Sequence, residues 1–147
     1  MQTRTYFIYL IEDEVADYFY GRENKFYELF VADRKVQGDL QEIVKKQIHF
    51  ITKPLPYLEL HRHLSSSVQK TDMHIKGKAY YIDASKGKKR AELIIKKRYL
   101  KLDALGGFES ESIFFEVLRK FDGRFLAVDI ENNRYGWIKA VKERKYV

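Results

Sequence analysis

The sequence predicts an α+β fold, a single domain in which a mixed, largely antiparallel sheet is covered by helices. Three observations support this class. A β-branched and aromatic segment near the start leads into helical patterns, the apolar period becomes strand-like from residue 72, and a late amphipathic segment precedes a hairpin pattern. A chain of 147 residues fits one domain spanning residues 1–147, long enough to bury a core without disulfides or metal.

The first predicted elements are a strand and a helix. Residues 3–11 (TRTYFIYLI) have the composition of a buried strand, and the acidic residues at 12–14 suit the positive end of a helix. Gly21 then interrupts the helical pattern. The sequence leaves open whether one bent helix continues past Gly21 or a short helix closes near Tyr20 and a second begins around Glu23.

A longer helix is predicted over residues 40–52, with Asp39 as its N-cap and Pro54 as its stop. Its apolar side chains recur at helical spacing, at Leu40, Ile43, Val44, Ile48 and Ile51. Residues 53–56 (KPLP) predict a rigid turn, because proline fixes its own φ and restricts the residue before it. We expect a further helical turn over residues 57–64 and a loop over the serines at 65–67.

The middle of the chain predicts strands. The strand-like segments are MHIKGKAYYIDA (73–84), RAELIIKKR (90–98) and YLKLDAL (99–105), and the basic residues at 86–89 form a turn between the first two.

The last part of the chain predicts a helix and a hairpin. Ser110 or Ser112 is expected to cap a helix that reaches Phe121, with Gly123 ending it. Its inward stripe consists of Ile113, Phe114, Val117, Leu118 and Phe121. Residues 124–130 and 135–140 predict a strand pair joined by residues 131–134, whose asparagines tolerate positive φ.

The composition restricts the class of protein. The absence of cysteine excludes thiol catalysis, thiolate metal sites and disulfides. The start of the chain lacks the apolar stretch and cleavage site of a signal peptide, and no run approaches the roughly 20 apolar residues that span a bilayer. We therefore expect a soluble, cytoplasmic protein without a membrane segment.

No motif in the sequence predicts catalysis or a cofactor. His61 and His63, near Glu59, have the only metal-like spacing, but the pattern LELHRHL predicts a helix as readily and no second carboxylate cluster completes a site. Solvated or hydrogen-bonded histidines are the favoured interpretation. Gly106 and Gly107 lack the spacing of a phosphate-binding loop, and no serine elbow is present. We expect no catalytic residue, no metal site and no cofactor.

The most informative segment is residues 15–31, which holds more apolar and aromatic side chains than one buried helix face accommodates. On a helix these side chains cover an arc of roughly 220°, whereas the apolar stripe of a surface helix covers ~100°. Such a surplus predicts a surface that another protein covers. The alternative, equally open, is that the whole arc is buried between the sheet and the helix over residues 40–52.

Two helix edges together could form this protein-binding surface. Val15, Tyr18 and Phe19 share one edge of the first helix, and Ile43, Gln47 and Phe50 share one edge of the helix over residues 40–52. Arg22 is expected to supply a charge at the rim. The candidate site residues are Val15, Tyr18, Phe19, Arg22, Gln47 and Phe50.

A net charge of +7 and a basic run suggest a second function, direct nucleic-acid binding. The run combines basic residues with tyrosines, as stacking and phosphate-binding surfaces do. A solvated sheet face is the favoured interpretation, because no nucleic-acid-binding module encloses the run. Its members are Lys86, Lys88, Lys89, Arg90, Lys96, Lys97, Arg98 and Lys101, with Tyr80, Tyr81 and Tyr99.

Three segments resemble the sporulation inhibitor of replication family, SirA, of endospore-forming bacteria. They are YLIEDEVADYFYGRENKFYELF, KKQIHFITKPLP and IFFEVLRKFDGRFLAVDIENNRYGWIKAVKERKYV, while residues 72–108 match poorly. None of them is a catalytic signature. The combination of YGRE with RYGWI and a closing aromatic-valine pair carries the resemblance.

The resemblance implies a non-enzymatic inhibitor of replication initiation that binds the N-terminal domain of the initiator DnaA. It implies contacts from Val15 and Phe19 on the first helix and from Gln47 and Phe50 on the following helix, whereas Tyr18 and Arg22 are added from geometry. Val15 stands where the family pattern leads us to expect phenylalanine. A smaller side chain buries less area, so we expect lower affinity or a compensating change in the partner.

Overall fold

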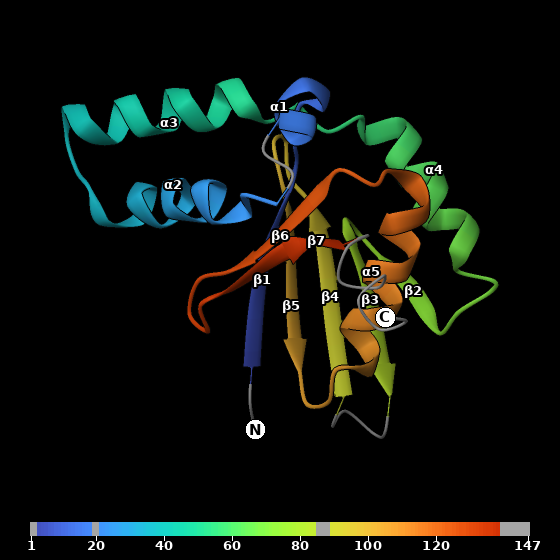
Figure 1. Cartoon of the computed structure of the whole chain (residues 1–147). Coiled ribbons are helices and arrows are strands. Elements are labelled where there is room, and N and C mark those ends of the chain that lie inside the picture. Colours follow the sequence, from blue (N-terminus) through green and yellow to red (C-terminus); the bar gives the residue numbers. More distant parts are fainter. Residues whose placement is uncertain (1–2, 19–20, 85–88, 139–147) are drawn as a thin grey trace.

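The structure is a computed structural model that describes residues 3–18, 21–84 and 89–138 (Figure 1). The helices described there are α1 (Asp13–Tyr18), α2 (Glu23–Lys35), α3 (Asp39–Ile51), α4 (Tyr57–Ser67) and α5 (Glu109–Phe121). The strands are β1 (Thr3–Leu10), β2 (Met73–Lys76), β3 (Ala79–Ala84), β4 (Lys89–Ile95), β5 (Leu100–Leu105), β6 (Phe125–Asp129) and β7 (Arg134–Trp137).

Within the described residues the strands form one sheet in the order β2-β3-β4-β5-β1-β6-β7. Every pairing in this sheet is antiparallel. The first strand of the chain therefore lies inside the sheet, between β5 and β6, where both of its edges are paired. The predicted α+β class is confirmed, with helices packed against the sheet.

β1 supplies side chains to both faces of the sheet. Its alternate residues Tyr6, Ile8 and Leu10 are buried on one face, whereas Tyr9 packs on the other face with Phe30 of α2, ring to ring at 4.2 Å. This alternation follows from the two-residue period of a strand. Because each face carries apolar side chains, each must be covered by helices, and the domain has two cores.

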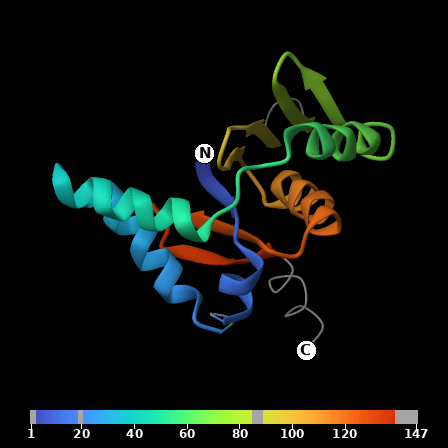
Figure 2. The ribbon, with the colours of Figure 1, turned by 90° about the horizontal axis from the view of Figure 1, so that it is seen from above.

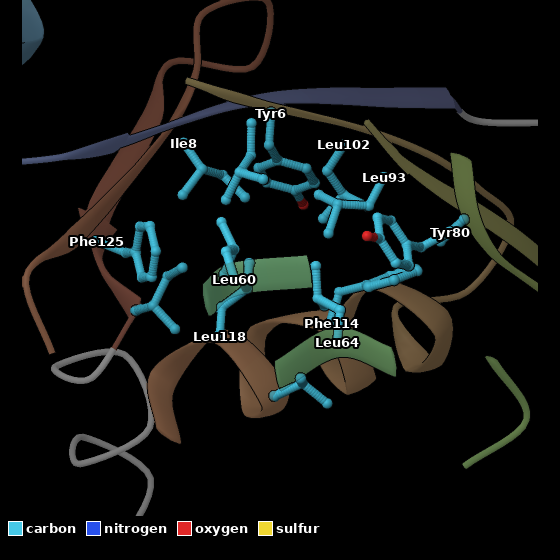
Figure 3. Close-up of a cluster of buried hydrophobic side chains, with 14 of the residues drawn as sticks. Tyr6, Ile8, Leu60, Leu64, Tyr80, Leu93, Leu102, Phe114, Leu118 and Phe125 are labelled. Atoms are coloured by element: carbon cyan, nitrogen blue, oxygen red, sulfur yellow. The ribbon is translucent and has the colours of Figure 1, made fainter. Parts of the chain in front are cut away.

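The first core lies between the sheet and the helices α4 and α5 (Figure 3). α5 carries the stripe that its sequence predicts, with Phe114, Val117 and Leu118 buried. α4 contributes Leu60 and Leu64, both fully buried. These helices cover β3, β4 and β5. The first core therefore lies on one side of the molecule, over this half of the sheet.

The second core lies on the opposite face, beneath α2. Phe26 and Phe30 of α2 pack against Leu126, Val128 and Trp137 of β6 and β7. α3 runs alongside α2, so α2 is enclosed between the sheet and α3. Figure 2 shows the α2–α3 pair on one side of the molecule and α4 with α5 on the other.

The break near Gly21 separates two helices, which resolves the alternative that the sequence left open. Among the described residues α1 covers Asp13–Tyr18 and α2 begins at Glu23, with Gly21 and Arg22 outside both helices. Gly21 has φ 86°, in the left-handed region that favours glycine after a helix. Because of this break, α2 packs along the sheet, whereas α1 does not.

Three local predictions are wrong. Ser65, Ser66 and Ser67 are helical, and the hydroxyls of Ser66 and Ser67 donate to the carbonyl oxygen of His63 at 2.7 and 3.3 Å. Such bonds satisfy the serine side chain without ending the helix. Neither predicted serine caps α5, since the helix begins at Glu109 and Phe108 occupies the cap position. Asp39 is likewise inside α3, after Gly38.

The segment 73–84 forms two strands instead of one. Gly77 at φ 61° begins a two-residue turn, so Lys76 pairs with Ala79 and β2 and β3 form a hairpin. Glycine at the first turn position matches the type II′ turn. The C-terminal hairpin of β6 and β7 is confirmed, with Asn133 at φ 52° in its turn. The segments 85–88 and 139–140 lie outside the described residues.

A buried ion pair joins β1 to α5, and no pattern in the sequence indicates it. The guanidinium of Arg4 donates from Nε to both carboxylate oxygens of Glu111 at 2.9 and 3.1 Å, and both side chains are buried. The hydrogen bond to Glu111 raises the pKa of Arg4 above its usual range. Arg4 also donates to the carbonyl oxygen of Gly107 at 3.2 Å. This pair fixes the start of α5 on the edge of the first core.

Candidate protein-binding surface

Backbone hydrogen bonds hold the start of α1 against the end of α3. The amide of Glu12 donates to the carbonyl of Ile51 at 2.8 Å, and the amide of Lys53 donates to the carbonyl of Leu10 at 2.7 Å. Ile11 and Thr52 form an isolated β-bridge between these bonds. Two helices that are 20 residues and more apart in the chain therefore meet at one junction, at the top of Figure 1.

An ion pair strengthens the same junction. Lys53 Nζ donates to Asp13 Oδ1 at 2.7 Å, and Arg124 Nε lies 3.6 Å from the same oxygen. The hydrogen bond from Lys53 lowers the pKa of the Asp13 carboxyl, and both cations add to the effect. An acidic residue in the first turn of α1 also suits the positive end of the helix. The carboxylate thus remains charged at physiological pH.

α3 has an inward side and an exposed apolar flank. Val44, Ile48 and Ile51 face α2 and the second core. The exposed apolar flank lies about a quarter of a turn away and is defined here as Leu40, Ile43, Gln47 and Phe50. Its apolar members are 54%, 53% and 77% exposed, in chain order, and Gln47 is exposed between them. Single exposed apolar residues are ordinary, but a row of them along one helix marks an interaction site.

α1 adds two side chains to this surface. Val15 is half-buried and packs against the second core, which Ile48 and Ile51 of α3 also contact. Tyr18 is 71% exposed at the end of α1. Val15 therefore keeps part of its side chain at the outside of the protein. We define the α1–α3 surface as Val15, Tyr18 and the exposed apolar flank.

Two predicted residues are not placed on this surface. Phe19 lies outside the described residues. Arg22 is exposed directly before α2, where its carbonyl accepts a hydrogen bond from Lys25 N at 3.0 Å. No contact joins Arg22 to Gln47 or Phe50 in the described structure, so its rim role stays a prediction.

The structure shows that the exposed apolar surface comes mainly from α3 and not from α2. Phe26 and Phe30 are buried, and Tyr27, Leu29 and Val31 are half-buried, because α2 lies between the sheet and α3. For α2, the alternative of a buried arc therefore holds. The larger exposed area is on α3, where Leu40 and Ile43 of the predicted apolar stripe are exposed.

The histidines of α4 have hydrogen-bond partners. His61 Nδ1 contacts the hydroxyl of Tyr80 and its ring stacks on Tyr57, while His63 Nε2 lies 2.6 Å from the carbonyl oxygen of Val117. On a helix, residues two apart point to different sides. Burial raises the pKa of Tyr80 to about 12. In the part of the chain that the structure describes, no three metal-ligating side chains cluster.

The basic run does not form one surface within the described residues. Lys89 and Lys96 stand at opposite ends of β4, roughly 20 Å apart by strand geometry. Lys89 pairs with Glu109 at 3.2 Å, and Lys101 lies 3.9 Å from Asp103. Lys86 and Lys88 lie outside the described residues.

Arg98, another member of the run, closes the C-terminal end of α3. Its Nη2 donates to the carbonyl oxygens of His49 and Thr52 at 2.8 and 2.9 Å. A cation in this position satisfies free carbonyls and suits the negative end of the helix. Arg98 therefore has a structural role at the α1–α3 surface.

No helix in the described ranges has the length and hydropathy of a membrane span.

Comparison with known proteins identifies the family. The family model described as sporulation inhibitor of replication protein SirA matches residues 4–142. The sporulation inhibitor of replication protein SirA of Bacillus subtilis (strain 168) is 40% identical over 146 residues, which cover 98% of this chain and 99% of that protein. Both matches extend over nearly the whole chain. The chain belongs to the SirA family of sporulation inhibitors of replication.

Proposed function

We propose that this protein inhibits the initiation of chromosome replication during sporulation by binding the N-terminal domain of the initiator DnaA in the cytoplasm. Its family membership and its similarity to a protein named as a sporulation inhibitor of replication support the inhibitory role. The resemblance noted in the sequence supports DnaA as the partner. Inhibition of this kind needs no cofactor, because it is sufficient for the protein to cover a surface of the initiator.

The observation that carries this proposal is the exposed apolar flank of α3 beside α1. Phe50 is 77% exposed although it is a large aromatic side chain, and Ile43 and Leu40 extend the row over three helical turns. An aromatic anchor surrounded by aliphatic side chains and one amide is the composition of a protein interface core. Gln47 would supply a hydrogen bond within the interface.

The α1–α3 surface is also rigid enough to bind without rearrangement. Its two helices are joined by the backbone bonds of Glu12 and Lys53 and by the Lys53–Asp13 ion pair. A surface already in its binding conformation loses less entropy on association. We therefore place the partner across both helices, with Val15 and Tyr18 on one side and Phe50 on the other.

A pull-down with the separated domains of the initiator tests the proposal. Wild-type protein should retain the N-terminal domain and none of the others. Phe50→Ala should weaken this binding at least tenfold, since truncation of a central aromatic residue costs about 2 kcal/mol or more. Its melting temperature should stay near that of the wild type, because the side chain is exposed.

Leu58→Ala is the matched control, since Leu58 of α4 is 64% exposed but lies outside the α1–α3 surface. It should bind as the wild type does. Equal effects of both variants would contradict the position of the surface, and retention of a different initiator domain would contradict the partner domain. Phe19→Ala, the prediction made from sequence, should weaken binding in the same way.

A further inference from the structure

α3 has a second exposed side, and this side is basic. Lys46 is exposed directly beside the exposed apolar flank, three residues after Ile43 and four before Phe50, whereas Lys45 and His49 are exposed farther round the helix. The turn between β4 and β5 carries two more exposed lysines, Lys96 and Lys97.

Hydrogen bonds hold this turn against α3. Arg98 donates to the carbonyl oxygens of His49 and Thr52 at 2.8 and 2.9 Å. The amide of Leu55 donates to the carbonyl of Lys97 at 3.1 Å, and the amide of Lys96 donates to the carbonyl of Tyr99 at 2.9 Å. The turn with Lys96 and Lys97 is thus held at the C-terminal end of the helix that carries Lys45 and Lys46. We define the basic flank as Lys45, Lys46, Lys96 and Lys97.

The lysines of the basic flank have no carboxylate partner in the described structure. None of the four forms an ion pair there, whereas Lys53 and Lys89 pair with Asp13 and Glu109. Positive charges that have no counter-charge nearby are stabilised when an opposite charge approaches. The basic flank therefore favours an anionic partner.

We propose that the basic flank attracts carboxylates that border the apolar contact area of the protein partner, and that it speeds their association. The inference rests on the proposed function and adds the charge of the partner surface. Lys46 lies one helical turn before Phe50 on the same side of α3, so a partner centred on Phe50 also reaches Lys46, and Lys45, Lys96 and Lys97 add to the positive field around it. Charges at the rim of an interface act mainly on the association rate.

A protein partner fits these observations better than nucleic acid does. Asp13, Glu14 and Asp17 are exposed on α1, next to the end of α3. These carboxylates would repel a continuous phosphate backbone, whereas a protein surface can place its own charges between them. A phosphate backbone also makes no use of the exposed aliphatic side chains of Leu40 and Ile43.

Stopped-flow association with the initiator's N-terminal domain tests the inference at low and high salt. Lys96→Glu/Lys97→Glu and Lys45→Glu/Lys46→Glu should each lower the association rate constant about tenfold at low salt, with a smaller effect at high salt because ions screen the charges. The dissociation rate should change little. Lys76→Glu/Lys78→Glu is the matched control, since it alters the charge equally in another exposed hairpin turn.

The remaining outcomes distinguish failure of the inference from failure of the proposed function. Equal association rates for test and control variants would overturn the inference and leave the proposed function intact. Absence of a complex with wild-type protein would overturn both. Binding to a duplex DNA fragment, measured by fluorescence anisotropy, should not depend on the basic flank. If the Lys96→Glu/Lys97→Glu variant loses DNA binding while its association with the initiator domain is unchanged, the flank serves nucleic acid and the inference is wrong.

Discussion

At the scale of single residues, the same side chain has opposite roles depending on its helix. Phe30 of α2 is buried and stacks on Tyr9, while Phe50 of α3 is 77% exposed. Both lie in apolar, helical sequence patterns. What distinguishes them is the neighbour that each helix face meets. Phe30 therefore contributes to the core, and Phe50 remains available for a partner.

The ion pair of Arg4 and Glu111 gives a prediction at this scale. Arg4→Met or Glu111→Leu alone should lower the free energy of unfolding by about 3–5 kcal/mol, because each leaves a buried charge without its partner. The double variant Arg4→Met/Glu111→Leu should recover most of that loss. Urea denaturation checks both statements. A double variant as unstable as the sum of the singles would show that the two side chains act independently.

At the scale of elements, the break between α1 and α2 decides which side chains are exposed. α2 lies flat between the sheet and α3, and α1 turns away to meet the end of α3. A continuous helix could not make both contacts. The conformation at Gly21 is thus part of what forms the α1–α3 surface.

Gly21→Ala should lower stability by about 1 kcal/mol, because an L side chain is strained at φ 86°. A Cβ atom at this position meets no other atom within 4 Å, so the effect isolates backbone conformation from steric clash. Gly21→Asn should cost less, since asparagine tolerates this region. Thermal unfolding of the three proteins provides the measurement, and equal stability of the alanine and glycine forms would refute the explanation.

At the scale of the whole molecule, titratable groups in several elements set the pH range of stability. The hydrogen bond from Lys53 lowers the pKa of Asp13, and a hydrogen bond from its own backbone, followed by one from Lys89, lowers that of Glu109. These groups stabilise the fold above the pKa of the unfolded chain, near pH 4, and the effect is lost as pH falls through their lowered pKa. Burial raises the pKa of Tyr9 and of Tyr80 to about 12.

The buried tyrosines limit the stability of the fold at alkaline pH. Their contribution is complete below the unfolded pKa, near pH 10, and is lost as pH rises toward 12. The free energy of unfolding should therefore be nearly constant from about pH 5 to about pH 9 and decline on both sides. Tyr9→Phe should flatten the alkaline decline when unfolding is followed by circular dichroism. An unchanged alkaline slope in this variant would show that Tyr9 does not contribute to it.

The sequence by itself determined the α+β class, the amphipathic helix α5, the C-terminal hairpin and the family, because periodicity and motifs are local properties of the chain. It also selected Gln47 and Phe50 as residues on one helix edge. Only the tertiary structure decided which apolar faces stay exposed. α2 is enclosed by α3 and the sheet, whereas nothing described covers Leu40, Ile43 and Phe50.

The Arg4–Glu111 pair and the basic flank were also decided by tertiary structure alone. Arg4 and Glu111 are 107 residues apart, and Lys45 and Lys96 come from a helix and a distant turn. No local pattern encodes such contacts, since they form only when the sheet and its helices pack. Whether a side chain is buried depends on both of the surfaces that meet, and a sequence pattern describes only one of them.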